Sequence, residues 1–244
     1  MSYDLNNVPH LSRLQVDHTA SRILKEAEHE LGEKFRPPID PGIIAENFLG
    51  LKLLYCDMIG EFKVADLNGG LIITEKKVLI EESQVEVRAN FTIGHEIGHW
   101  VLHRDLIEIP NPNQSAFFSD SENDSSSPML CRASSSKAWG ERQADWFSAS
   151  LLMPGQFVLE AFNKVSKSPF SVKRKTLESF IPGEPARTRN KNGLQDLDEE
   201  WQIIGLVDDV KKAGNFENVS SEALRIRLQQ LKLIVSEIET TPAF

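Results

Sequence analysis

Two histidines and a glutamate lie close together in the part of this sequence best suited to chemistry. His95-Glu96-Ile97-Gly98-His99 has the form H-E-x-x-H, which zinc-dependent hydrolases use. Residues four positions apart lie on one face of an α-helix, so the imidazoles of His95 and His99 can reach one ion at about 2.0–2.1 Å. Glu96 lies about 100° round the helix from His95, where its carboxylate can take a proton from a metal-bound water. The motif predicts a metal-dependent hydrolase; the alternative is a core helix whose histidines face a polar neighbour.

A catalytic zinc site needs a third protein ligand and a fourth position for water. His103 is a poor candidate, because it lies about 12 Å further along the helix axis than His95 and three side chains along that length cannot close a tetrahedron. Glu141 is a better one, since Asp145 lies one turn later on the same helix face and can accept the second ring N–H of a ligand histidine. Cys131 could cap the metal as an inhibitory ligand, although an inert cysteine is the simpler interpretation.

The elements around the motif are predicted from hydrophobic period and turn residues. Residues 85–103 are read as a core helix; Gly94 and Gly98 lower its propensity by up to about 1 kcal/mol each, which indicates that another element packs closely there. Before it, three short apolar segments predict a small antiparallel sheet over residues 51–55, 70–74 and 77–80, with a turn at residues 68–70. A strand edge beside the helix would suit an extended peptide substrate.

The rest of the chain is predicted to be helical, with two irregular segments. Residue 32 is a glycine C-cap, residue 40 an aspartate N-cap, and residue 220 or 221 a serine N-cap. The helices are predicted over residues 19–31, 41–48, 138–152, 154–165, 197–213 and 220–237. Residues 105–136 have no hydrophobic period and are interpreted as a long loop at the mouth of the site.

Composition excludes several classes of protein. The net charge of −9 argues against nucleic acid as the main partner, since such binding needs a basic surface. The only cysteines are Cys56 and Cys131, so a disulfide framework is not expected. Residues 1–10 lack the pattern of a signal peptide, and no apolar run approaches the length of about 20 residues that a membrane span needs. We therefore expect a cytoplasmic enzyme.

Two stretches of the sequence together resemble the ImmA/IrrE family of metallopeptidases. Residues 91–103 (FTIGHEIGHWVLH) hold the H-E-x-x-H helix, and residues 141–154 (ERQADWFSASLLMP) are similar to the E-x-x-A-[ND]-x-F-A-x-x-L-L-M-P helix that follows it in the family. The resemblance covers roughly residues 38–165. Gly94 and Ser148 stand where alanine is usual, and the segment between the two helices is long. These departures remove no chemical group and bear on loop conformation and substrate fit.

This resemblance implies a set of site residues. His95, His99 and Glu141 would bind Zn²⁺, with Mn²⁺ as the alternative, and Glu96 would be the general base. Asp145 would lie where thermolysin-like gluzincins place a carboxylate behind a histidine ligand. The sequence does not identify the donor that stabilises the oxyanion, for which the candidates are His103, Tyr55 and Arg88.

The expected fold is α+β, with a small antiparallel sheet packed on a zincin-like H-E-x-x-H helix and a second ligand helix. We assign residues 1–165 to a metallopeptidase domain and residues 166–195 to a basic linker. Residues 196–244 would form a mostly helical C-terminal region that resembles the helical tail of the family.

The function that the resemblance implies is that of a zinc endopeptidase. Its protein substrate would be a helix-turn-helix (Xre-type) transcriptional repressor, and cleavage would derepress mobile-element or stress-response genes. Residues 1–37 are too few for a fused repressor domain, so we expect the repressor to be a separate chain. Two alternatives stay open: a non-catalytic zinc-containing regulatory or DNA/protein-binding module, and a toxin-like or general hydrolase on the same site.

Overall fold

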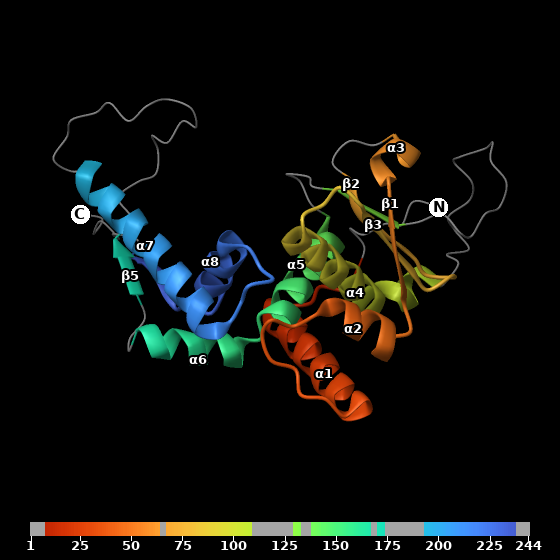
Figure 1. Cartoon of the computed structure of the whole chain (residues 1–244), viewed down its shortest axis with the longest axis horizontal. Coiled ribbons are helices and arrows are strands. Elements are labelled where there is room, and N and C mark those ends of the chain that lie inside the picture. The colour runs from red at the N-terminus through yellow and green to blue at the C-terminus, as the bar shows by residue number, and fades with distance from the viewer. Residues whose placement is uncertain are drawn as a thin grey trace. The chain divides into compact units, whose positions relative to one another are not determined.

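The computed structural model describes residues 8–63, 67–108, 129–132, 138–166, 170–173 and 193–237 (Figure 1). In these residues the fold is α+β, as predicted. The chain divides into two compact units, Met1–Pro154 and Gly155–Phe244. The first unit contains the H-E-x-x-H motif and a four-stranded sheet, and the second contains three helices and a pair of strands among its described residues. Within the described ranges, no helix has both the length and the apolar character needed to cross a membrane.

The first unit begins with helix α1, Arg13–Leu31, whose two ends are set by local chemistry. At its start the Ser12 hydroxyl accepts the Gln15 backbone N–H while the Gln15 side chain accepts the Ser12 backbone N–H, a capping box. At its end Gly32 takes a left-handed conformation with φ of 69°, as predicted from the glycine. The helix starts six residues earlier than predicted, because the prediction overlooked this serine cap.

The next segment is a short helix followed by a wider turn. Asp40 accepts the Gly42 backbone N–H at 2.7 Å and caps α2, Pro41–Ile43, which confirms the predicted cap. The chain continues as a π-helix, η1, over Ile44–Phe48. Ile44 and Ala45 are buried in the main core, so this turn anchors the connection from α1 to the sheet.

The sheet of the first unit is mixed rather than antiparallel. Its order is β1-β3-β2-β4, with β1 over Lys52–Cys56, β2 over Leu67–Ile72, β3 over Lys77–Glu81 and β4 over Met129–Arg132. β2 pairs antiparallel with β3 and β4, but β1 pairs parallel with β3. The prediction of an all-antiparallel sheet was wrong for β1, because the chain crosses over through α3, Met58–Phe62, and β2 before β3 pairs with β1.

The turn predicted at residues 68–70 was also wrong. These residues lie inside β2, and the hairpin turn follows at residues 73–76, where Lys76 has φ of 50°. The glycine at position 69 serves close packing instead, because a Cβ there would clash with Thr92 of the motif helix. A glycine pair in an apolar run therefore marked a close approach and not a reversal of the chain.

The motif helix, α4, runs over Glu86–Glu108 and lies between the sheet and the second predicted ligand helix, α5, over Trp139–Leu152. It contacts β2 and β3 through one side and α5 through another, and α1 in turn packs against α5 (Figure 1). The main core lies between these layers. It includes Ile93, Ile97, Phe147 and Leu151, each at most 2% exposed. Of the predicted loop, residues 105–108 extend α4, residues 129–132 form β4, and the other residues lie outside the described ranges.

The second unit contains α6, Gly155–Val165; β5, Phe170–Lys173; α7, Gly193–Gly214; α8, Ser221–Gln230; and β6, Ile234–Glu237. Ser220 caps α8, as predicted, but the single helix predicted over residues 220–237 was wrong. The chain turns at Lys232, where φ is 58°, and β6 then pairs parallel with β5. Helix α6, which the sequence assigned to the first domain, packs against α7. Of the predicted linker, residues 170–173 form β5, residues 193–195 begin α7, and residues 167–169 and 174–192 lie outside the described ranges.

Candidate metal site

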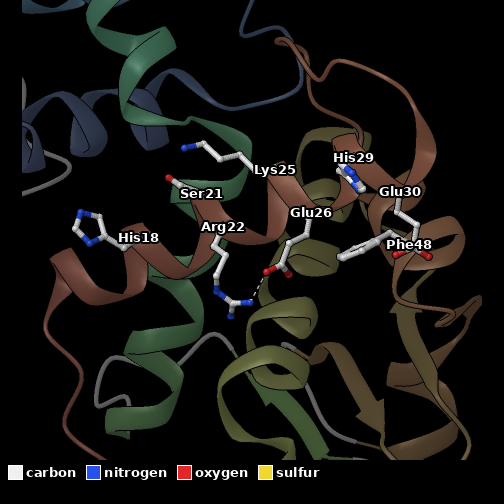
Figure 2. A pocket seen from close by; sticks show the side chains of 8 residues that line it. All are labelled: His18, Ser21, Arg22, Lys25, Glu26, His29, Glu30 and Phe48. Atoms are coloured by element: carbon white, nitrogen blue, oxygen red, sulfur yellow. Dashed lines mark hydrogen bonds and ion pairs between the residues drawn. The ribbon is translucent and has the colours of Figure 1, made fainter.

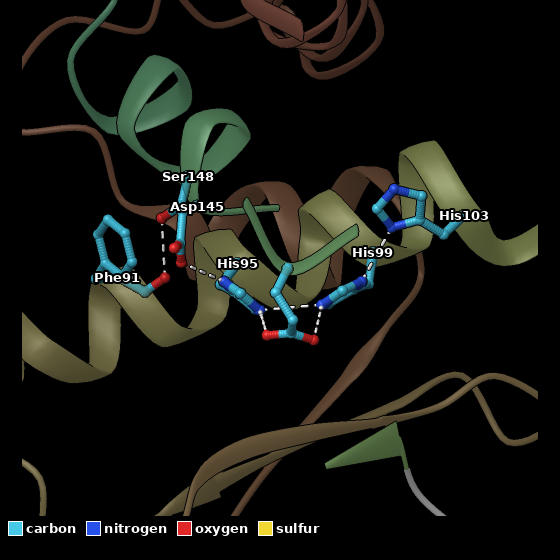
Figure 3. Close-up of polar contacts among 7 residues, drawn as sticks. Phe91, His95, His99, His103, Asp145 and Ser148 are labelled. Carbon is cyan, nitrogen blue, oxygen red and sulfur yellow. Dashed lines mark hydrogen bonds and ion pairs between the residues drawn. The ribbon is translucent and has the colours of Figure 1, made fainter. Parts of the chain in front are cut away.

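Three predicted ligand residues converge in the first unit (Figure 3). His95 Nε2 lies 3.3 Å from one carboxylate oxygen of Glu141, and His99 Nε2 lies 3.2 Å from the other. The two Nε2 atoms are 3.0 Å apart. A tetrahedral ion with bonds of about 2.0–2.1 Å would hold its ligand atoms about 3.3 Å from one another. The two histidine contacts use different oxygens of Glu141, and one ligand atom from each of the three residues lies within 4.8 Å of the others, so the group could hold a metal ion.

The close crossing of α4 and α5 brings the glutamate to the histidines. Gly94 and Gly98 lie one turn apart on α4, and each faces α5 without a side chain. A Cβ at Gly98 would lie 3.0 Å from the Ala144 Cα, and one at Gly94 would lie 2.6 Å from the Ser148 Oγ. Ser148 donates its hydroxyl to the Phe91 carbonyl oxygen at 2.9 Å, which ties the two helices together. The close packing that the two glycines predicted is therefore confirmed.

The charges in the group also suit a cation. Burial lowers the pKa of His99 to about 4, so its ring is neutral and keeps a lone pair at neutral pH. Burial acts to raise the pKa of the Glu141 carboxyl, but its hydrogen bonds with His95 and His99 outweigh this effect and bring the pKa far below its ordinary value. Glu141 is therefore an ionised carboxylate beside the neutral ring of His99, and both kinds of group are donors that bind zinc.

Asp145 lies behind His95, where the sequence analysis expected it. One of its carboxylate oxygens lies 3.0 Å from His95 Nδ1. A carboxylate can only accept, so His95 Nδ1 carries a proton, and in the neutral tautomer that would bind a metal the lone pair is on Nε2. This hydrogen bond fixes both the tautomer and the orientation of the ring toward the candidate metal position.

Glu96 is the most unusual side chain of the site. It is 0% exposed, and neither carboxylate oxygen has a hydrogen-bond partner among the described residues. Its Oε1 lies so close to β2 that a Cβ at Gly69 would be 3.2 Å away. Burial raises the pKa of Glu96 to about 8, His95 opposes this rise and Glu141 adds to it. Buried carboxyls normally have partners, so this one marks a position where a water molecule or a ligand would bind.

The three candidates for the oxyanion donor lie in different surroundings. His103 is buried behind His99, and its ring nitrogens contact His99 and Gln143. Arg88 is exposed on α4, seven residues and about 10 Å along the axis before His95. Tyr55 is on β1, and the acidic groups that raise its pKa, after burial, are Asp40, Glu46 and Glu86. Of the three candidates, only His103 contacts a member of the candidate metal group in the contacts given above.

Two further positions at the site were missed by the sequence analysis. Gln143, which is 0% exposed, contacts His103, and Gly69 makes room for the Glu96 carboxyl. Nothing in the sequence indicated a role for Gln143 except its position between Glu141 and Asp145. Cys131, the other considered ligand, lies in β4 opposite Gly69, and its side chain is outside the described part of the structure.

A separate shallow pocket lies along the outer face of α1, away from the metal group (Figure 2). Its lining includes Arg22, Lys25 and His29 of α1 and Phe48 of η1. Arg22 is already paired with Glu26 at 2.8 Å, and both side chains are about half exposed. Charges of both signs and open solvent make this a solvated helix face rather than a reactive centre.

Comparison of the sequence with known protein families and with curated proteins found no match in either.

Proposed function

We propose that this protein is a metal-dependent peptidase whose metal is held by His95, His99 and Glu141 and whose general base is Glu96. The observation that carries the proposal is the Glu96 carboxyl, which is fully buried and without a described partner beside three converging ligand atoms. A purely structural metal site would have no use for such a group. In a hydrolase, the same carboxyl is placed to handle the proton of a water molecule.

The chemistry divides among the side chains. A bound Zn²⁺, or Mn²⁺, would acidify a water molecule and polarise a peptide carbonyl. Glu96 accepts the proton of the attacking water and passes it to the leaving amine. Because burial raises the pKa of Glu96 to about 8 in the metal-free protein, its ionised form is a stronger base than an ordinary glutamate. Glu141 supplies one negative charge, and Asp145 holds the His95 ring in place.

The substrate proposal rests on the motifs and goes further than the site itself. The resemblance of residues 91–103 and 141–154 to the ImmA/IrrE family supports a helix-turn-helix repressor of the Xre type as the substrate. Its cleavage would derepress mobile-element or stress-response genes. Among the described strands β4 is an outer one, and it pairs with β2, which contains Gly69; an extended peptide could pair along it.

A cleavage assay with two glutamate variants of the same helix tests the proposal. Purified protein with added Zn²⁺ or Mn²⁺ would be incubated with a helix-turn-helix repressor encoded beside its gene and with a pool of fluorogenic peptides. Glu96→Gln should keep its metal content but lose about 10²- to 10⁴-fold in kcat. Glu86→Gln, at the exposed start of α4, is the matched control and should cleave like the wild type.

Two results would contradict parts of this proposal. Equal cleavage by the wild type and Glu96→Gln would remove the assigned base. Stoichiometric metal binding without cleavage of any repressor or peptide would favour the alternative of a non-catalytic zinc-containing regulatory module. Strong, salt-dependent binding to random duplex DNA would then give that module a nucleic-acid partner.

A further inference from the structure

The second ring nitrogen of His99 leads into a chain of buried polar contacts that the proposed reaction does not use. His99 Nδ1 lies 3.0 Å from His103 Nδ1, and His103 Nε2 lies 3.0 Å from Gln143 Oε1. The Gln143 amide nitrogen donates to the backbone carbonyl of Pro9 at 2.7 Å. All three side chains are at most 1% exposed. The chain thus connects a candidate metal ligand on α4 to α5 and then to the segment before α1.

The Pro9 carbonyl, at the end of this series of polar contacts, determines the direction of each hydrogen bond in the series. A backbone carbonyl only accepts, so the amide nitrogen of Gln143 must face Pro9 and its oxygen must face His103. His103 Nε2 must then carry a proton, and in a neutral ring Nδ1 is left with a lone pair. His99 Nδ1 can contact that lone pair only as an N–H donor. In this tautomer the lone pair of His99 Nε2 is available to a metal ion held with Glu141.

Several contacts hold the Pro9 carbonyl in place. The ring of the next residue, His10, stacks on Trp139 of α5, with centroids 4.1 Å apart and planes 16° from parallel. The Arg13 guanidinium lies over the Trp146 ring, 5.0 Å from its centroid. Trp139, Gln143 and Trp146 are spaced by four and three residues, so they lie on one face of α5. The segment that supplies the acceptor is therefore bound to the helix that carries Gln143 and Glu141.

We propose that His103 and Gln143 are positioning residues, which hold His99 in the tautomer that binds metal. The inference rests on the metal site of the proposed function and not on peptide cleavage. The two histidine ligands are then oriented by different means. His95 relies on the carboxylate of Asp145, whereas His99 relies on a neutral relay that adds no charge to the buried side of the site.

Nitrogen NMR on the Zn²⁺-loaded protein tests the relay directly. Long-range ¹H–¹⁵N correlation distinguishes a protonated from an unprotonated ring nitrogen in each histidine. The relay predicts that His99 carries its proton on Nδ1 and that His103 carries its proton on Nε2. A neutral His99 with its proton on Nε2, or a His103 with its proton on Nδ1, would overturn the inference.

Metal affinity gives a second measurement that does not depend on turnover. Gln143→Met keeps the side-chain volume but can neither accept from His103 nor donate to Pro9. It should weaken Zn²⁺ binding about 10- to 100-fold in a chelator competition and change the visible spectrum of the Co²⁺-loaded protein. Ser150→Ala, a buried polar position on α5 outside the relay, is the matched control and should do neither.

The outcomes of these experiments separate this inference from the proposed function. Gln143→Met with wild-type Zn²⁺ affinity and an unchanged His103 tautomer would show that the polar chain serves packing alone. If the protein has the predicted tautomers and binds Zn²⁺ but cleaves nothing, the relay is supported and the peptidase is rejected. If it cleaves a substrate but has the reversed tautomers, the peptidase is supported and the relay is rejected.

Discussion

Replacing Gly98 with alanine should disturb the metal site through the packing of two helices and without touching a ligand. The added Cβ would lie 3.0 Å from the Ala144 Cα, 3.1 Å from the Phe147 Cβ and 3.2 Å from the Ala144 carbonyl oxygen. Carbon atoms in good contact lie about 3.5–4.0 Å apart, so α4 and α5 would have to separate by about half an ångström. Two of the three atoms belong to the backbone and cannot rotate away.

Two opposing effects determine how much Gly98→Ala changes the free energy of unfolding. Alanine gains about 1 kcal/mol over glycine in helix propensity, whereas overpacking of a filled core costs about 1–3 kcal/mol. The net expectation is a loss of up to about 2 kcal/mol in the free energy of unfolding. Gly98 precedes His99, and Ala144 follows Glu141 by one turn, so the same movement would widen the 3.2 Å separation between their ligand atoms. Sites of this kind tolerate displacements of about 0.5 Å, so Zn²⁺ affinity should fall by roughly tenfold or more.

Urea unfolding of purified Gly98→Ala measures the loss in the free energy of unfolding. A chelator competition on the same protein measures the loss in Zn²⁺ affinity. Gly205→Ala, on α7, is the matched control, because a Cβ there meets nothing within 4 Å. It should show the gain in propensity alone, a stabilisation of up to about 1 kcal/mol. Should Gly98→Ala be as stable as Gly205→Ala and bind Zn²⁺ like the wild type, the close crossing of α4 and α5 would have no role in placing Glu141.

Three further predictions concern the same site. Burial raises the pKa of Glu96 from 4.5 to about 8 in the metal-free protein, so the folded state holds a proton that the unfolded state releases. The free energy of unfolding should therefore fall by up to about 1.4 kcal/mol per pH unit as the pH rises from 4.5 to about 8. Glu96→Gln should remove this dependence on pH. If urea unfolding shows the same difference in stability between the two proteins at every pH, the reasoning is refuted. Asp145→Ala removes the acceptor of His95 Nδ1 and should weaken Zn²⁺ binding about 10- to 100-fold in a chelator competition, and wild-type affinity would contradict the assigned tautomer. Gly69→Ala places a Cβ against Thr92 and Glu96, and should lower kcat more than Zn²⁺ affinity, because it displaces the base and not the ligands; equal losses would show a general disruption of the site.

Much of the site could be predicted because its chemistry is local in sequence. The spacing of His95 and His99 follows from one helical turn, and Glu141 and Asp145 share the next predicted helix face. The caps at Ser220, Asp40 and Gly32 were predictable for the same reason, since each acts on backbone groups a few residues away.

The features that were not predicted depend on partners far away in the chain. The parallel pairing of β1 with β3 is set by the crossover between them, which hydrophobic period cannot reveal. Residues 234–237 form a strand because β5 pairs with them, although their spacing also fits a helix. Gln143 looked like an ordinary polar helix residue, and only its burial between His103 and Pro9 gives it a role.

The division of the chain into two units has a consequence for heat denaturation. All three residues of the metal group belong to Met1–Pro154. An ion that binds only the folded form stabilises it by about 4.1 kcal/mol at a free concentration 1,000 times Kd. That gain would act on the folded form of the N-terminal unit, so Zn²⁺ should raise the melting temperature of that unit. A calorimetric scan with and without Zn²⁺ would measure the shift, and the lifetime of the folded N-terminal unit would follow the metal supply of its surroundings.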